Sequence, residues 1–309
     1  MNNNLAFVFP GQGSQSLGML ADLADNPVVI ACFKEASDAL GYDLWDVIQN
    51  DPKGELNQTH VTQPALLTAS VAIWRAWQEQ GGETPSVLAG HSLGEYSALV
   101  CAGVIRLSDG VKLVEKRGNY MQEAVPAGVG AMYAIIGLAD DAIIDACEKA
   151  AQNEVVSAVN FNSPGQVVIA GNKAAVERAG ELCKEAGAKR ALPLPVSVPS
   201  HCALMKPAAD KLAADLQAID FNAPTIPVIN NVDVSMESNG DNIKNALIRQ
   251  LYSPVRWTET VETMAQMSID TVVEAGPGKV LQGLIKRTNK QLSCVSVNSA
   301  DTLSNALEN

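Results

Sequence analysis

The stretch Ser86-Val87-Leu88-Ala89-Gly90-His91-Ser92-Leu93-Gly94-Glu95-Tyr96 decides the fold, because it joins an apolar run to a helical pattern through Gly-x-Ser-x-Gly. The run at 86–89 predicts a buried strand, and 95–101 predicts a helix. A sharp turn between the two, with glycines around Ser92, is the setting of a nucleophile elbow. Amides at the start of such a helix face developing negative charge. Ser92 is therefore the candidate nucleophile, and an ordinary glycine-rich turn is the alternative.

Outward from this stretch, strand and helix patterns alternate, which predicts a parallel sheet covered on both faces. Further strands are expected at 5–9, 227–230 and 270–274, and helices at 65–80, 107–125, 204–218, 241–252 and from Gly278 to about 287. The helix at 65–80 is expected to begin after Thr62, with Pro64 in its first turn, and Ser108 is a possible N-cap of the next helix.

A different order of elements occupies the middle of the chain. It runs strand (131–136), helix (140–151), strand (155–160), strand (166–170), helix (173–186) and strand (190–196), with a hairpin turn at 162–165. This order is typical of the ferredoxin-like unit. The predicted fold class is therefore α/β, with a large parallel-sheet domain at 1–126 and 198–309 and a ferredoxin-like subdomain inserted at 127–197.

Composition excludes several classes of protein. With 309 residues, 47% hydrophobic and 18% charged, the chain is expected to fold into one large or two modest domains rather than to stay disordered. A net charge of −12 repels phosphate backbones, so no nucleic-acid partner is expected. Apolar runs of about 20 residues are missing, so no membrane span is expected. Six scattered cysteines and an N-terminus unlike a signal peptide indicate reduced thiols in the cytoplasm.

A nucleophilic serine needs a base, and the chain offers only His60, His91 and His201. His91 adjoins Ser92, so its side chain should leave the strand on the other face, as a hydrogen-bonded histidine near the site. His60 lies among polar residues and is expected at the surface. His201 stands where the chain returns from the small unit to the large domain. It is favoured as the base over a structural role.

The loop Gly11-Gln12-Gly13 follows the first predicted strand directly. It does not match a dinucleotide-binding loop, because Ser16 stands where the third glycine is needed. A glycine-bent loop whose amides help to form an oxyanion hole fits better. Val273 likewise excludes a P-loop ending at Gly278-Lys279, and no metal-ligand spacing is present. We therefore expect no metal and no permanently bound cofactor.

Arg117 is an unusual charge on an apolar helical pattern, beside Leu113, Val114 and Met121. Such an arginine most often extends to the surface or pairs with a carboxylate of the protein. The functional alternative is a fork for the carboxylate of a substrate.

Together these motifs resemble the malonyl-CoA:acyl carrier protein transacylase family of fatty acid synthesis. The resemblance covers nearly the whole chain. It rests on ordered matches at 9–15, 63–65, 90–96, 117–118, 121–122, 130–132, 162–166, 196–201 and 274–278. It implies a hydrolase-like large domain with a ferredoxin-like insert, malonyl-CoA as substrate and an acyl carrier protein as partner.

The resemblance also implies a role for each matching residue. Ser92 would carry the malonyl ester, and His201 would be the general base and acid, oriented by the main-chain carbonyl of Gln250. The backbone amides of Gln12 and Leu93 would form the oxyanion hole. Arg117 and Gln12 would bind the substrate, and Arg117 would do so through the carboxylate of the malonyl group. Because the family's carrier proteins are acidic, Lys189-Arg190 and Lys286-Arg287 are the candidate docking pairs.

Two positions differ from common family forms. Ser200 stands where many malonyl-selective relatives have Phe, and Tyr133 where a small residue is frequent. Because of these two positions, the sequence determines the preferred acyl group less well than it determines the type of reaction. Two alternative functions remain open: a thioesterase or esterase that uses the same elbow, and a binding module that needs no activated serine.

Overall fold

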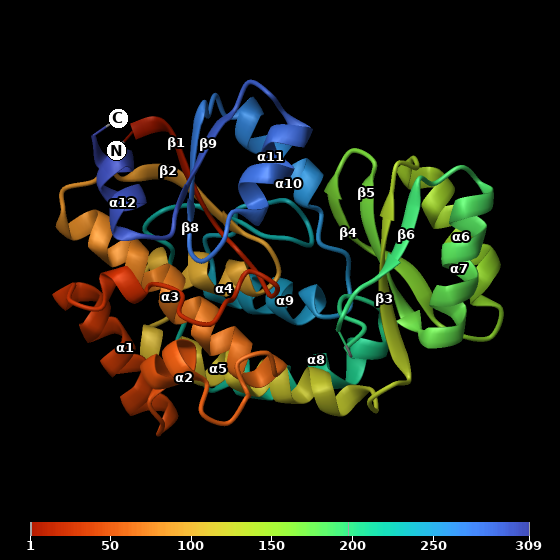
Figure 1. Ribbon diagram of the computed structural model, residues 1–309, viewed down its shortest axis with the longest axis horizontal. Coiled ribbons are helices and arrows are strands. Elements are labelled where there is room, and N and C mark those ends of the chain that lie inside the picture. The colour runs from red at the N-terminus through yellow and green to blue at the C-terminus, as the bar shows by residue number, and fades with distance from the viewer. Residues whose placement is uncertain (1, 197, 309) are drawn as a thin grey trace.

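A five-stranded sheet in the order β7-β2-β1-β8-β9 forms the centre of the larger part of the molecule. All four strand pairs are parallel. The computed structural model describes residues 2–196 and 198–308 (Figure 1). The strands are β1 (Asn2–Phe9), β2 (Pro85–Gly90), β7 (Val228–Ile229), β8 (Thr271–Ala275) and β9 (Ser293–Val297).

Alternating residues of β1 face two separate cores, because successive side chains of a strand point to opposite faces. Phe7 and Phe9 pack toward a large core shared with several helices. Ala6 and Val8 pack on the other face, under two helices. The helices of the first core are α1 (Pro27–Leu40), α2 (Leu44–Asn50), α3 (Thr59–Glu79), α4 (Leu93–Cys101), α5 (Leu107–Ala124), α8 (Lys206–Gln217) and α9 (Gly240–Gln250), and those of the other face are α10 (Trp257–Gln266) and α11 (Val280–Thr288).

A second, antiparallel sheet in the order β4-β5-β3-β6 stands beside the first (Figure 1). Its strands are β3 (Gly130–Ile136), β4 (Val156–Ser163), β5 (Gln166–Asn172) and β6 (Arg190–Pro193). Helices α6 (Asp140–Ala151) and α7 (Lys173–Glu185) cover one face. Counted within this unit the strand order is 2-3-1-4, which is the ferredoxin-like arrangement. The predicted fold class is thus confirmed.

The exact domain limits, 1–126 with 198–309 and 127–197, stay a prediction. The strands of the antiparallel sheet run from Gly130 to Pro193. Met1, Ser197 and Asn309 lie outside the described residues. Within the described part of the chain, no helix has the length and apolarity to cross a membrane.

Two expected helix starts are wrong. Helix α3 begins at Thr59, not after Thr62, so Pro64 lies inside it. Nearly all of α3 is buried, and this packing outweighs the single backbone hydrogen bond that a proline removes. Ser108 is already inside α5, where Arg106 is the N-cap residue and makes no side-chain cap.

The expectations above give no range for several elements of the structure. These are α1, α2, β9, α10, the final helix α12 (Ala300–Leu307) and the short 3-10 helix at Ala21–Leu23. Of these, α10 matters for the site, because it brings Trp257 to within 5.6 Å of His91, measured between ring centroids.

Candidate functional site

Ser92 lies at a strained turn between β2 and α4. Its φ of 52° and ψ of −109° are rare for a residue with a side chain. The glycines on either side of Ser92 leave no room for a side chain. A Cβ on Gly90 would lie 1.9 Å from the carbonyl of Gly94, and a Cβ on Gly94 would lie 2.0 Å from the carbonyl oxygen of Phe9. The turn therefore presents the serine side chain as a nucleophile elbow does.

The side chain of Asn231 closes this turn. Its Oδ1 accepts a 2.8 Å hydrogen bond from the backbone N–H of Ser92, and its Nδ2 donates to the carbonyl of Gly90 at 2.7 Å. Asn231 is completely buried, just beyond the carboxyl end of β7. Because β7 and β2 are parallel neighbours, their carboxyl ends meet at one edge of the sheet.

His201 lies against the nucleophile. The Oγ of Ser92 is 2.8 Å from Nε2 of His201, and Nδ1 of His201 is 2.7 Å from the main-chain oxygen of Gln250. A carbonyl oxygen only accepts, so Nδ1 carries the proton and Nε2 is free to take one from the serine. Gln250 is the last residue of α9, where carbonyl groups lack intrahelical partners and carry partial negative charge.

Burial and the positive charge of Arg117 together lower the pKa of His201 to about 3. The hydrogen bond to the main-chain oxygen of Gln250 opposes this shift. The imidazole is therefore neutral near pH 7, which is the form that can act as a base.

Arg117 extends from α5 into the same cluster and is only 1% exposed. Its Nη2 donates to Ser92 Oγ at 3.2 Å and to Gln250 Oε1 at 3.0 Å. Its Nη1 donates to Gln63 Oε1 at 2.8 Å. Its Nε makes no hydrogen bond to any described residue, and none of the ion pairs found among those residues includes Arg117. A buried guanidinium with unused donors beside a serine is suited to bind an anionic ligand.

The loop after β1 lies directly against the elbow. A Cβ on Gly11 would be 2.5 Å from the carbonyl oxygen of His91, so only glycine allows this approach. Gln12 and Leu93 both line the cleft. As the first residue of α4, Leu93 has a backbone N–H without an intrahelical acceptor. Both residues therefore border the space beside Ser92, and their role as oxyanion-hole donors stays a prediction.

His91 and His60 take other positions. Nε2 of His91 is 2.8 Å from Oδ1 of Asn162, a residue of the antiparallel sheet, so His91 is a hydrogen-bonded histidine beside the site. His60 is half-buried in the first turn of α3 rather than at the surface, because Gly118 of α5 packs against its backbone.

The cleft itself is small, about 130 Å³, and both sheets contribute to it. Its lining from the antiparallel part is Met132, Asn160, Leu194 and Val196, and Ser200 also faces it. Tyr133 does not line it and instead packs on Gly180 of α7. Of the two unusual positions, only Ser200 therefore borders the space beside Ser92.

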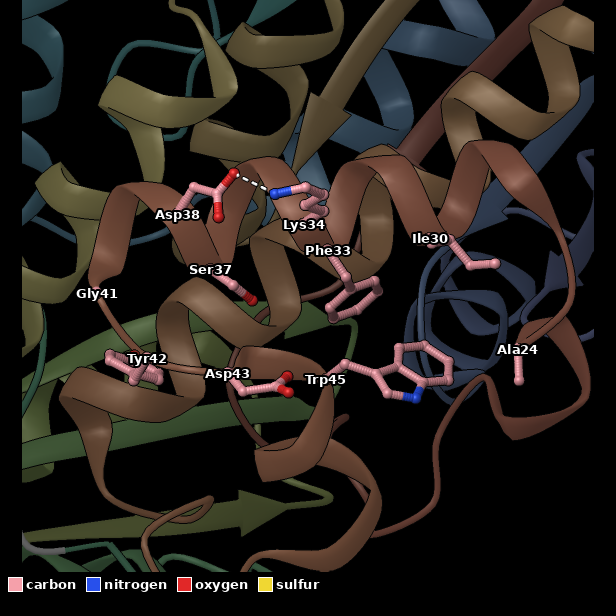
Figure 2. Close-up of a pocket in the computed structure, with 10 residues that line it drawn as sticks. All are labelled: Ala24, Ile30, Phe33, Lys34, Ser37, Asp38, Gly41, Tyr42, Asp43 and Trp45. Atoms are coloured by element: carbon pink, nitrogen blue, oxygen red, sulfur yellow. Dashed lines mark hydrogen bonds and ion pairs between the residues drawn. The ribbon is translucent and has the colours of Figure 1, made fainter.

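A larger hollow, with a volume of about 640 Å³, lies on the surface of α1 and α2. Figure 2 shows the residues that line it, among them the ion pair of Lys34 and Asp38. None of the expected site residues lines it. Nor does any group of three or more His, Cys, Asp or Glu suited to a metal ion occur in residues 2–196 and 198–308. Ser92, His201 and Arg117 all line the smaller cleft.

The structure adds three residues that had no expected role: Gln63, Glu95 and Asn231. Asn231 could have been found, because it is a polar residue directly after an expected strand at the same sheet edge as Ser92. Gln63 and Glu95 lie in stretches that the family resemblance matches, but each is inside a helix and its partner is distant in sequence. Gln63 of α3 meets Arg117 of α5, and Glu95 of α4 meets Gln250 of α9.

The chain matches the acyl transferase domain model over residues 6–306. It is 66% identical over 304 residues, 98% of each chain, to the malonyl CoA-acyl carrier protein transacylase of Escherichia coli (strain K12). It is 46% identical to that of Bacillus subtilis (strain 168), over 99% of this chain and 97% of the relative.

Solved structures agree. An acyl carrier protein S-malonyltransferase from Vibrio cholerae is 68% identical, with a TM-score of 0.97 over 98% of this chain and 99% of the other. A malonyl-transacylase in complex with a type II PKS acyl-carrier protein is 64% identical, with a TM-score of 0.97 over 99% of both chains. With its Ser–His pair and buried arginine, the chain belongs to the acyl transferase family, among the malonyl CoA-acyl carrier protein transacylases.

Proposed function

We propose that this protein transfers the malonyl group of malonyl-CoA to the phosphopantetheine thiol of an acyl carrier protein, and so supplies fatty acid chain elongation. The observation that carries the proposal is the buried Arg117, 3.2 Å from the nucleophile and without a carboxylate partner among the described ion pairs. A free carboxylate on the acyl group supplies the missing partner. The carrier as acceptor is supported by the names of the relatives and by the complex described above.

In the first half-reaction, Ser92 Oγ attacks the thioester carbonyl of malonyl-CoA while His201 Nε2 takes its proton. The amides of Gln12 and Leu93 receive the oxyanion of the tetrahedral intermediate. The intermediate breaks its C–S bond, and His201 returns the proton to the departing thiolate of coenzyme A. The products are malonyl-Ser92 and free coenzyme A.

In the second half-reaction, His201 takes the proton of the carrier thiol, and the thiolate attacks the serine ester. Collapse breaks the C–O bond to Ser92, and His201 returns the proton to Oγ. Throughout both steps the carbonyl of Gln250 holds Nδ1–H, as the carboxylate of a Ser-His-Asp triad does. Malonyl-CoA is thus a substrate, and no step calls for a resident cofactor.

The two candidate docking pairs lie near one end of the strands of the antiparallel sheet, which supports them as a surface for an acidic carrier. Gln166, Ile136 and Arg190 lie side by side on β5, β3 and β6, and Nη1 of Arg287 donates to Gln166 Oε1. Two strand spacings span about 10 Å, so the two pairs are close. All four side chains are exposed, and none lines the cleft.

We propose that the reaction takes place in the cytoplasm. The six cysteines, which are free thiols in the structure, support a reducing compartment.

A thioesterase would use the same first step, with water in place of the carrier thiol in the second. The test follows the malonyl group from malonyl-CoA in the presence and absence of a holo carrier. Transfer predicts that most of the group appears on the carrier and that free malonate forms slowly. Release of malonate at the same rate with and without carrier would instead establish the hydrolase.

A further inference from the structure

The side chain of Gln250 makes contacts that are distinct from those of its main chain. Its Oε1 accepts the 3.0 Å hydrogen bond from Nη2 of Arg117, while its Nε2 donates to Glu95 Oε2 at 2.8 Å and to the carbonyl of Ser92 at 3.1 Å. Gln250 is completely buried. A single amide group therefore separates the guanidinium from a buried carboxyl group.

The orientation of this amide follows from the chemistry of its neighbours. A guanidinium only donates, so the amide oxygen must face Arg117. The amide nitrogen faces two acceptors, the carbonyl of Ser92 and the Oε2 of Glu95 that also accepts from the backbone N–H of Asn231. Turning the amide over would place N–H against N–H on one side and oxygen against oxygen on the other. Glu95, together with the main-chain carbonyl of Ser92, thus determines which end of Gln250 faces the arginine.

Glu95 itself lies outside the cleft. It is the third residue of α4, 1% exposed, and does not line the space beside Ser92. Its Oε2 also accepts a 3.0 Å hydrogen bond from the backbone N–H of Asn231. Burial raises the pKa of Glu95 to about 7, and the hydrogen bonds from Asn231 and Gln250, with the charge of Arg117, oppose that rise.

We propose that Glu95 and the side chain of Gln250 are positioning residues for Arg117, with Glu95 acting through Gln250 to aim the guanidinium at the carboxylate of the acyl group. This inference rests on the proposed function, because it concerns how that site selects a carboxylate-bearing acyl group. Neither side chain touches the reacting carbonyl.

The test compares rates of Ser92 acylation by malonyl-CoA and acetyl-CoA, measured by rapid quench and intact mass. Glu95→Gln keeps the shape of the side chain but removes its charge. Gln250→Met keeps the main-chain carbonyl of residue 250 but removes all hydrogen bonds of the side chain, those to Arg117 and Glu95 included. Each variant should lower the ratio of malonyl to acetyl kcat/KM about 10-fold, as expected for a weakened hydrogen bond to a charged group.

The double variant decides whether Glu95 acts through Gln250. It should lower the ratio no further than Gln250→Met alone, because residues that share one path are not additive. Glu274→Gln is the matched control: Glu274 is also completely buried and accepts from backbone amides, at the start of α11, but it lies outside the cluster. This control should leave the ratio unchanged, even if the melting temperature falls.

Unchanged ratios in both single variants would overturn the inference, as would independent, multiplicative losses in the double variant. If Glu95→Gln does not fold, Gln250→Met alone must still lower the ratio. Failure of the wild-type protein to form malonyl-Ser92 would instead reject the proposed function, so the two failures are distinguishable.

Discussion

At the scale of single residues, the proposed function assigns to Arg117 the choice of acyl group, because its buried guanidinium lies beside Ser92. Removing a buried charge-assisted hydrogen bond on one side costs about 2 to 5 kcal/mol. Arg117→Ala should therefore depress malonyl transfer strongly and acetyl transfer much less. Steady-state kcat/KM for both coenzyme A esters measures this. Equal losses for the two esters would show that Arg117 supports the structure of Ser92 and not the recognition of a carboxylate.

The protonation of His201 gives a second prediction at this scale. Burial and the charge of Arg117 hold its pKa at about 3, below the ordinary value of 6.5. A base whose pKa is lowered stays neutral as the pH falls, so His201 should be neutral down to about pH 5. Histidine NMR can follow this, because the chain has only three histidines and His201→Ala assigns the signal. A midpoint near 6.5 would contradict it.

At the scale of elements, the close approach of α4 to β1 explains the glycine after the nucleophile. Gly94→Ala would place a Cβ 2.0 Å from the backbone of Phe9, so α4 must shift away from the sheet. We expect a loss of roughly 2 kcal/mol or more in unfolding free energy, together with most of the acylation rate.

Gly283 of α11 is the matched control for Gly94, because a Cβ there meets nothing within 4 Å. Gly283→Ala should stabilise the protein by roughly 0.5 to 1 kcal/mol through helix propensity and leave acylation unaltered. Denaturant unfolding and acylation rates of the two variants provide the comparison. Similar behaviour of both would mean that the close approach of α4 to β1 is not what requires Gly94.

The proposed docking surface, formed by Lys189-Arg190 near β6 and Lys286-Arg287 of α11, gives the next prediction. Reversing Lys189 and Arg190, or Lys286 and Arg287, to Glu should raise the apparent KM for the carrier and flatten its dependence on salt. Acylation by malonyl-CoA alone should stay the same, because these side chains do not line the cleft. Unaltered carrier kinetics in both double reversals at low ionic strength would place the docking surface elsewhere.

At the scale of the whole molecule, the site exists because two sheets meet. His91 of the elbow reaches Asn162 at 2.8 Å, Asn160 forms a bridge with Val255, and Arg287 reaches Gln166. These contacts hold the antiparallel sheet against the elbow that carries Ser92, and residues of both parts line the cleft.

The sequence predicts much of this arrangement, and the parts it misses have physical reasons. Strand and helix patterns indicate both sheets, and the elbow motif with the family resemblance names Ser92, His201, Gln250 and Arg117. Local patterns do not predict a helix boundary that depends on tertiary packing. The first turn of α3 is an example, because it forms before Pro64 in a part of the helix that is buried. The roles of Glu95 and Asn231 depend on hydrogen bonds between residues 136 positions apart, which no local pattern contains.

The central claim is that Ser92 carries the malonyl group and His201 activates it. Intact mass after mixing with malonyl-CoA, followed by peptide mapping, tests it most directly. The account predicts one malonyl adduct on Ser92 in the wild-type protein, none in Ser92→Ala, and formation slowed by about 10³-fold or more in His201→Ala. An adduct on another residue, or near wild-type acylation in His201→Ala, would contradict the account.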